Sequence, residues 1–383
     1  MKTINILHII SKFHGDYPLL DDFILRLEPD RYQSTVIFLR GKPEKPTRIE
    51  RAGIETIYPE KYLGQSRLIF PRRVLFLKSV IRDRGIDIIH CHRHKPTVYG
   101  VISSILAGGK PVISTVHGTG RTRSKKRQFT NRIIFNKTAR IIGVSKAVHD
   151  DILMTNKWID KEKVISIPNG LDYSKYLKVS SIPKQKIREE ILKGHANSYW
   201  FGMVGRLAPK KNHQRLFRVF KNLVIDFPDS ILLVAGAGQL EYELKKQIKD
   251  LGLEHNIVLL GQRENIPTFL HSLDAFIFPS LNEGLGLALL EAMAVGLPVV
   301  AADIGPCQEV VDSTESAILV DPKDEDSILK GLLKLRRLNT EEQSGMGIKA
   351  RQRVLDAFTI EQMTEQIIRV YDDILLDQSK NRG

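Results

Sequence analysis

The sequence predicts an α/β protein with two domains, each built on a doubly wound parallel sheet. Its 383 residues suggest two or three domains, because a domain typically holds ~150 residues. Short apolar runs alternate with longer amphipathic ones, which is typical of β-α units on a parallel sheet. A polar stretch after residue 172 interrupts the alternation, which restarts at 199. We therefore expect two sheets facing a cleft, with ligands at the carboxyl ends of the strands.

Predicted strands are short apolar, β-branched runs between turn residues. In the first domain they are 4–10, 34–39, 87–92, 111–117, 139–145 and 163–170. In the second they are 199–206, 230–236, 256–261, 275–280, 298–303 and 317–321. Helical patterns lie between them, including 67–84, 96–109 and 340–377.

The domain boundaries follow from the same pattern. We expect an N-terminal domain over 1–178, a linker with a short helix over 179–198, and a second domain over 199–355. A C-terminal helix, 356–383, could cross back to the first domain.

Composition excludes several classes of protein. The two cysteines, Cys91 and Cys307, cannot form a disulfide framework. No apolar run reaches the ~18 residues of a membrane-spanning helix. Polar residues interrupt the apolar stretch at the N-terminus, and no small-residue cleavage site follows, so a signal peptide is not indicated. We expect a cytoplasmic protein.

The net charge of +14 is concentrated in the first half of the chain. Residues 1–178 hold 33 Lys and Arg against 16 Asp and Glu, and 121–127 and the amphipathic segment 67–84 are the densest parts. An anionic partner is indicated, and we favour the inner face of the plasma membrane, with peripheral contact. The simpler interpretation of 67–84 is a surface helix packed on its sheet. Nucleic acid is the weakest candidate, because aromatic residues are not interleaved with the basic ones.

The segment 281–303 carries the strongest chemical signal. A helix is predicted from about Gly286 to Val295, ended by Gly296 and Pro298. The free N–H groups of Gly286 and Leu287 would suit a phosphate. Glu291 lies among apolar residues inside this helix and needs donors, which the two hydroxyls of a ribose would supply. The alternative is a structural glutamate bonded to backbone.

A second signal lies in the segment 202–212. Arg206 and Lys211 follow the first strand of the second domain, where an anion would bind. Two cations near a helix N-terminus can hold a diphosphate. Two solvated surface cations are the alternative.

Together these segments resemble the retaining, nucleotide-sugar-dependent glycosyltransferases of family 4, which have the GT-B fold of two Rossmann-like domains. The family pattern of GR…K followed by E-x7-E corresponds to Gly205-Arg206…Lys211 and Glu283…Glu291. Weaker similarities are His117 in STVHG and the segments 167–172, 234–240 and 279–280. The resemblance spans most of the chain and is most specific over 199–312.

The resemblance implies roles for individual residues. Arg206, Lys211 and the backbone of Gly286 and Leu287 would hold the donor diphosphate, and Glu291 the ribose. Glu283 would contact the donor sugar, and His117 would face the cleft from the first domain as the other catalytic residue. Less specific assignments place Arg263 near the base and Gly15 and Asn169 on the acceptor side. His117 could equally be held by a backbone carbonyl, and a simple Asn-Gly turn is the better interpretation of Asn169.

The chain also departs from the family pattern. Its loop 11–18 contains Gly15 alone where the family has several glycines, which leaves the acceptor end open. Leu285 stands where phenylalanine is common. Gly305-Pro306 replaces a glycine pair and removes one N–H donor.

Three other sites are rejected. Gly236-Ala237-Gly238 lacks the third glycine and the acidic residue of an NAD site. The acids at 324–326 fit the first turn of a helix better than a metal-binding DxD motif. The cluster of His90, Cys91, His92 and His94 would be split between two faces by strand alternation. We expect no metal and no cofactor.

The sequence thus predicts transfer of a sugar from a UDP- or GDP-sugar, with retention, to a saccharide or lipid-linked saccharide acceptor. Synthesis of cell-surface polysaccharide, lipopolysaccharide or glycolipid is the expected setting. A nucleotide-sugar epimerase, a hydrolase or a phosphorylase on the same fold remains an alternative. A basic nucleic-acid-binding protein is a distant one.

Overall fold

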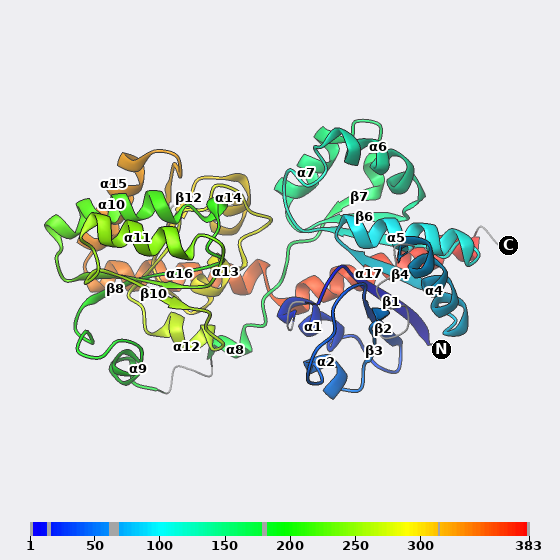
Figure 1. Cartoon of the computed structure of the whole chain (residues 1–383), viewed down its shortest axis with the longest axis horizontal. Helices are drawn as coiled ribbons and strands as arrows, with labels where there is room; N and C mark the ends of the chain where they lie inside the picture. The colour runs from blue at the N-terminus through cyan, green and yellow to red at the C-terminus, as the bar shows by residue number, and fades with distance from the viewer. Residues whose placement is uncertain (1–2, 14–16, 61–68, 178–181, 313–314, 381–383) are drawn as a thin grey trace. The chain divides into compact units, whose positions relative to one another are not determined.

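The computed structural model describes residues 3–13, 17–60, 69–177, 182–312 and 315–380. The chain divides into two compact units (Figure 1). Unit 1 consists of Met1–Gly170 together with Ile360–Gly383, and unit 2 of Leu171–Thr359.

The sheet of unit 1 has seven parallel strands in the order β3-β2-β1-β4-β5-β6-β7. Its central strands are buried along almost their whole length, which explains their continuous apolar runs. The strands are β1 (Ile4–Ile10), β2 (Tyr32–Phe38), β3 (Glu55–Ile57), β4 (Ile88–His92), β5 (Val112–Val116), β6 (Arg140–Gly143) and β7 (Val164–Ser166).

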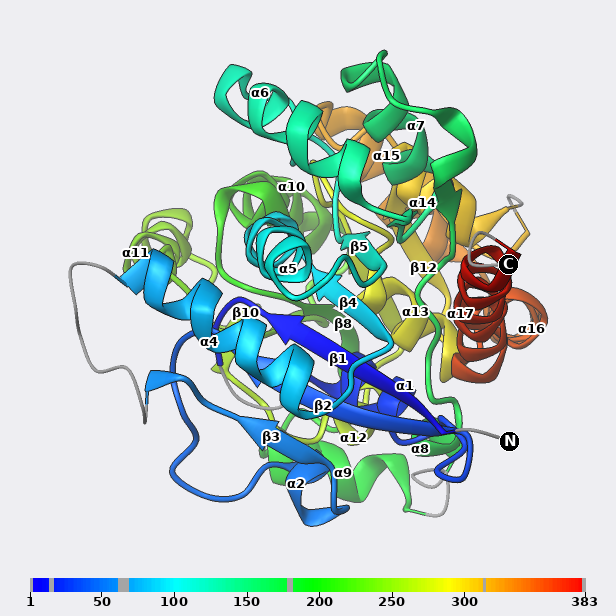
Figure 2. The ribbon, with the colours of Figure 1, turned by 90° about the vertical axis from the view of Figure 1, so that its right-hand side faces the viewer.

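Two apolar clusters form the core of unit 1. One includes residues of α4 and α5, which lie side by side (Figure 2). The other includes residues of α1 and of the C-terminal helix α17, among them Ile367, Tyr371 and Ile374. The helices are α1 (Pro18–Ile24), α2 (Arg48–Arg51), α4 (Ile69–Asp83), α5 (His94–Leu106), α6 (Lys125–Ile134), α7 (Lys146–Thr155) and α17 (Ile360–Lys380).

Unit 2 contains a six-stranded parallel sheet in the order β10-β9-β8-β11-β12-β13. Its strands are β8 (Tyr199–Val204), β9 (Ser230–Ala235), β10 (Ile257–Gly261), β11 (Ala275–Phe278), β12 (Val299–Ala302) and β13 (Ile318–Val320). Its α-helices are α8 (Ser174–Leu177), α9 (Lys184–Ile191), α10 (His213–Asp226), α11 (Glu241–Leu251), α12 (Ile266–His271), α13 (Leu287–Ala294), α14 (Gly305–Val311), α15 (Glu325–Arg337) and α16 (Thr340–Ala357). Two apolar clusters again make up the core.

The predicted linker, 179–198, belongs to unit 2 in the structure. Its helix α9 is fixed to the sheet by Asp274, which accepts bonds from Lys184 Nζ at 2.7 Å and Arg188 Nη2 at 2.6 Å. The Arg188 guanidinium also lies 4.8 Å from the centre of the Trp200 ring. These contacts attach a segment whose polar composition had suggested a free connection.

Strand β3 was not predicted, because Ile57 is its only apolar residue and no apolar run marks it. The helical stretch predicted at 340–377 forms as α16, which ends at Ala357 in unit 2, and α17, which begins at Ile360 in unit 1. Within the described ranges, no helix is long and apolar enough to cross a membrane.

Candidate functional site

The loops after β8 and β9 pack closely against each other, and Gly236 and Gly238 allow this contact. The Gly205 N–H donates to Ala235 O at 3.0 Å, and the Leu207 N–H donates to Ala237 O at 3.1 Å. A Cβ on Gly236 would lie 1.9 Å from Gly205 O, and a Cβ on Gly238 would lie 2.4 Å from Leu207 O. Only glycine permits this close approach, so these residues have a packing role that a dinucleotide site is not needed to explain.

We expect Gly236→Ala to destabilise unit 2 by at least ~1–3 kcal/mol, because the added methyl group overlaps a backbone oxygen. Gly345→Ala is the matched control, since a Cβ there meets no atom within 4 Å. Because Gly345 lies in the interior of α16, Gly345→Ala should raise the free energy of unfolding of unit 2 by roughly 0.5–1 kcal/mol. Urea unfolding of both variants measures the difference, and equal midpoints would contradict the packing role.

The single 3₁₀ turn Pro209–Lys211 places Lys211 at the carboxyl edge of the sheet. Asn212 follows in the left-handed conformation, with φ of 64°. Its amide donates to Pro279 O at 3.1 Å and Pro322 O at 2.7 Å. The Leu281 N–H donates to Lys210 O at 2.8 Å. The loop after β11 is therefore held against this turn.

A buried ion pair connects the two sequence motifs. Lys211 Nζ lies 2.6 Å from Glu283 Oε1, and both side chains are buried. Lys210 Nζ, on a more exposed side chain, lies 3.5 Å from Glu283 Oε2. The Lys211 ammonium also lies 4.8 Å from the centre of the Phe278 ring. Since a buried charge needs a partner, each member of the pair fixes the position of the other.

Helix α13 starts beside this pair with an open N-terminus. Its N-cap is Gly286, with a left-handed φ of 99°, and no side chain caps the helix. The first turn carries no acidic residue, so the N–H groups of Leu287 and Ala288 have no side-chain acceptor there. Such a terminus favours an anion through its free donors and the helix dipole.

Glu291, also on α13, is held in a poorly solvated position. Burial raises the pKa of its carboxyl group to about 7, while a hydrogen bond from Tyr176 and the charges of Lys211 and Lys175 act in the opposite direction. Tyr176 belongs to α8 and was not among the residues expected from the sequence. No local sequence pattern could have identified Tyr176, because it precedes Glu291 by more than a hundred residues.

Arg206 and Arg263 lie at the same edge of the sheet and are exposed. Arg206 follows Gly205 at the end of β8, and Arg263 follows β10 by two residues. Among the described residues neither has an ion-pair partner. The structure thus brings Lys211, Glu283 and α13 into contact and leaves two free cations on that edge.

The acids at 324–326 serve as a helix cap, as predicted. Asp324 is the N-cap of α15, and its Oδ1 accepts from the Asp326 N–H at 3.0 Å. Glu325 and Asp326 occupy the first turn.

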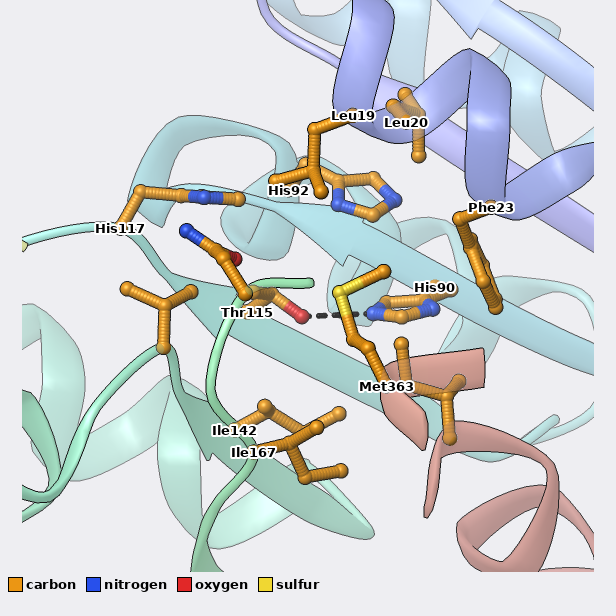
Figure 3. Close-up of a pocket in the computed structure, with 13 residues that line it drawn as sticks. Leu19, Leu20, Phe23, His90, His92, Thr115, His117, Ile142, Ile167 and Met363 are labelled. Carbon is orange, nitrogen blue, oxygen red and sulfur yellow. Dashed lines mark hydrogen bonds between the residues drawn. The ribbon is translucent and has the colours of Figure 1, made fainter. Parts of the chain in front are cut away.

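In unit 1, His117 and Asn169 line one small cavity of about 50 Å³ (Figure 3). His90, His92 and Thr115 lie on its wall, and apolar side chains of α1, α17, β6 and the segment after β7 line the remainder. Burial, followed by the charges of Arg93 and Arg121, lowers the pKa of His117 to about 4. Its imidazole is therefore neutral at physiological pH. The predicted acceptor-side residue Gly15 lies outside the described residues.

The expected division of the cluster between two faces holds for Cys91, which packs in the core cluster of α4 and α5, but His90 and His92 stay together. Residues two apart share a face, and the two rings stack with centroids 4.4 Å apart. His8 of the neighbouring strand joins them, with its Nδ1 3.5 Å from His92 Nε2.

This histidine group does not have the geometry of a metal site. Its ring nitrogens lie within 4.8 Å of one another, but stacked imidazoles do not direct their in-plane lone pairs at one point. Both nitrogens of His90 are also in hydrogen bonds of 2.7 Å, to Tyr371 and Thr115. A tetrahedral ion would require one of these bonds to break.

Comparison with protein families gives two matches. The family described as Glycosyl transferases group 1 matches residues 184–353. The family described as Glycosyltransferase Family 4 matches residues 19–175.

Individual proteins are also similar. UDP-Gal:alpha-D-GlcNAc-diphosphoundecaprenol alpha-1,3-galactosyltransferase of Escherichia coli is 29% identical over 316 residues, which are 80% of each chain. An uncharacterized glycosyltransferase of Methanocaldococcus jannaschii is 33% identical over 300 residues, which are 73% of this chain and 71% of that protein. The crystal structure of Anabaena HepE with UDP-glucose superposes with a TM-score of 0.80 at 23% identity, over 97% of this chain and 100% of that chain.

Proposed function

The chain belongs to glycosyltransferase family 4 and has the GT-B fold, and from this premise we propose that it transfers a sugar from a nucleotide diphosphate donor to an acceptor hydroxyl with retention. The observation that carries the proposal is the buried Lys211–Glu283 pair beside the open N-terminus of α13. Cations and free N–H groups together form a binding site for a diphosphate.

The donor would be held in the following way. Lys211, Arg206 and the N–H groups at Gly286 and Leu287 bind the diphosphate. Glu291 accepts hydrogen bonds from the ribose hydroxyls, which would relieve the unfavourable burial of its carboxylate. Arg263, exposed after the edge strand β10, would contact the base.

Glu283 serves a different purpose. Its carboxylate, fixed by Lys211, accepts from hydroxyls of the donor sugar and orients the anomeric carbon. His117 of unit 1, neutral at pH 7, contributes a hydrogen bond to the transferred sugar.

In the reaction the bond between the anomeric carbon and the diphosphate oxygen breaks, and the acceptor oxygen bonds to the same face of that carbon. The acceptor proton passes to the departing diphosphate. Because negative charge grows on the diphosphate, Lys211, Arg206 and α13 stabilise the transition state more than the bound donor. These groups would make a metal ion unnecessary.

UDP is the favoured nucleotide and GDP the alternative. The Anabaena neighbour is described with UDP-glucose, and the Escherichia coli relative is named for UDP-Gal and an alpha-1,3 product. An α product from an α-linked donor is the retaining outcome. The same name includes a diphosphoundecaprenol acceptor, which supports a lipid-linked saccharide acceptor and a role in cell-surface polysaccharide or glycolipid synthesis at the cytoplasmic face of the membrane.

We expect one nucleoside diphosphate among UDP, GDP and ADP to raise the melting temperature of unit 2, with EDTA present. A ligand at 100 times its dissociation constant adds about 2.7 kcal/mol. Arg206→Ala should remove the shift. Arg218→Ala is the matched control, because Arg218 of α10 is paired with Glu325 of α15 and is not part of the proposed cradle.

No shift with any nucleotide, or an unchanged shift in Arg206→Ala, would contradict the donor cradle. A shift that disappears in EDTA would contradict metal independence. Nucleotide release in the absence of any acceptor would favour a hydrolase or epimerase over a transferase.

We also propose that α6 contacts an anionic membrane surface. Phe129 and Ile133, one turn apart on this helix, are 72% and 57% exposed. The basic residues Lys125, Arg127 and Arg132 lie on the same helix. Exposed apolar side chains beside cations are typical of helices that lie on anionic lipid.

Vesicles containing phosphatidylglycerol should bind the protein, and Phe129→Ser should weaken this binding, because it removes apolar area without changing charge. Ile225→Ser is the matched control, since Ile225 on α10 of unit 2 is 75% exposed. Co-sedimentation with the vesicles measures both. Equal binding by the two variants and the parent protein would contradict a membrane role for α6.

A further inference from the structure

Arg73 is an arginine with almost no exposed surface and few partners. It lies on α4 with a relative exposure of 1%. Its Nη2 is 3.5 Å from Glu60 Oε1. Its Nε and Nη1 are buried without a hydrogen-bond partner. Such an arrangement is unfavourable, because a guanidinium carries five N–H donors and loses its hydration on burial.

The burial of Arg73 is not a general property of this basic helix. The adjacent Arg72 is exposed, as expected for a charged residue on an amphipathic helix. Both arginines belong to the basic amphipathic segment 67–84. The structure turns Arg73 inward, towards Glu60, which in turn accepts from the Gly41 N–H at the end of the sheet where the strands finish.

Two more cations lie at this end. Arg40 follows β2, and Lys95 is in the first turn of α5, which packs against α4. Burial lowers the pKa of the Lys95 ammonium, and the charges of Arg40 and Arg73 lower it further. The three cations therefore act on one another, and Glu60 is the acid paired with Arg73 among the described residues.

Glu60 is itself partly engaged elsewhere. Its Oε2 accepts from the Gly41 N–H at 3.0 Å. Helix α5 adds a further favourable feature for an anion, since its N-cap Arg93 makes no capping hydrogen bond and its first turn has no acidic residue. The site has more positive charge and more free donors than its own residues neutralise.

We propose that Arg73, Arg40 and Lys95 bind a phosphate or diphosphate group of the acceptor. Two phosphate oxygens can accept in bidentate fashion along the Nε–Nη2 edge of Arg73, in place of the 3.5 Å contact between Nη2 and Glu60. This inference rests on the proposed function, which is the reason for identifying the phosphate as part of an acceptor. The phosphate could come from a polyprenyl diphosphate carrier or from a soluble sugar phosphate.

The test uses pyrophosphate as the probe. It is titrated into the full-length protein saturated with UDP and, separately, into Arg206→Ala, so that the donor cradle does not contribute. We expect Arg73→Met to weaken pyrophosphate binding at least ~10-fold. Arg72→Met, the same change on the exposed neighbour, should leave affinity within about twofold, because Arg72 is not part of the proposed site.

Thermal stability gives an independent readout. Without anion, Arg73→Met should melt at or above the temperature of the parent, since it removes a poorly paired buried charge. Should that variant fail to fold, Lys95→Met and Arg40→Met replace exposed side chains and should each weaken pyrophosphate binding several-fold. Unchanged affinity in these variants, or equal loss in Arg72→Met, would overturn the proposal.

Two further arms separate the sources of phosphate. Farnesyl diphosphate binding at least ~10-fold more tightly than pyrophosphate would assign the site to a lipid-linked diphosphate. Equal binding of the two would assign it to soluble phosphorylated acceptors. UDP binding in unit 2 should be unchanged in Arg73→Met. A loss of UDP binding in every variant would contradict the proposed function, but it would not contradict this phosphate site.

Discussion

Lys211→Met should reduce the rate of sugar transfer by about 10²–10³-fold, the usual effect of removing one group that stabilises developing negative charge. The variant also leaves the buried Glu283 without its 2.6 Å partner. A lower melting temperature of unit 2 should therefore accompany the loss of rate, because a buried unpaired carboxylate is unfavourable. Product formation under saturating donor, together with thermal unfolding, measures both effects.

Lys210→Met is the matched control for this experiment. Lys210 is adjacent in sequence, carries the same charge and lies 3.5 Å from the same carboxylate, but its side chain is 46% exposed. We expect less than a tenfold loss of rate and little change in stability, as for other exposed ion pairs. Equal loss in both variants would show that total charge matters and that the buried pair has no special role.

Acid should destabilise unit 1 more than unit 2. Burial lowers the pKa of His8 to about 3 and that of His117 to about 4, and it lowers the pKa of His90 and His92 well below the usual value. A neutral histidine in the folded state takes up its proton only on unfolding. Stability is therefore complete above pH 6.5 and is lost as the pH falls towards the folded pKa values.

Between pH 7 and pH 5, each such histidine should cost unit 1 about 2 kcal/mol of unfolding free energy. In unit 2 the effects oppose each other. Burial lowers the pKa of His213 to about 4, so this residue destabilises unit 2 in acid. Burial raises the pKa of Glu291 to about 7, so this residue makes unit 2 more stable as the pH falls.

The two tryptophans report on the units separately, since Trp158 lies in unit 1 and Trp200 in unit 2. Urea unfolding of Trp200→Phe and Trp158→Phe at the two pH values gives each midpoint. His8→Gln should reduce the pH dependence of unit 1. Equal shifts of the two midpoints would contradict the assignment of acid sensitivity to the histidine group.

The sequence was sufficient to predict most of the fold. All of the strands in unit 2 and six of the seven in unit 1 overlap predicted runs, because a strand buried on both faces must be apolar almost throughout. Strand β3 escapes detection because Ile57 is its only apolar residue. The helix predicted at 286–295 forms as Leu287–Ala294, since the glycines and proline around it mark its ends.

The residues of the candidate site could be proposed from the sequence, but their contacts could not. Arg206, Lys211, Glu283 and Glu291 stand out because charged residues follow apolar strands or interrupt an apolar helix. That Lys211 pairs with Glu283 depends on β8 and β11 being neighbours in the sheet, which no local pattern contains. The inward turn of Arg73, and the meeting of His8 with residues of β4, depend on tertiary packing in the same way.

The path of α17 bears on how the protein is synthesised. This helix is made after the whole of unit 2, yet its Tyr371 bonds His90 and its apolar face completes a core that includes residues of β1. While the ribosome is still translating unit 2, the apolar surface of unit 1 that α17 covers stays exposed. Unit 2, made from one continuous segment, can fold first. The nascent first half should therefore be the part that chaperones hold, and a nonsense mutation shortly before α17 should yield protein that is degraded rather than half-active.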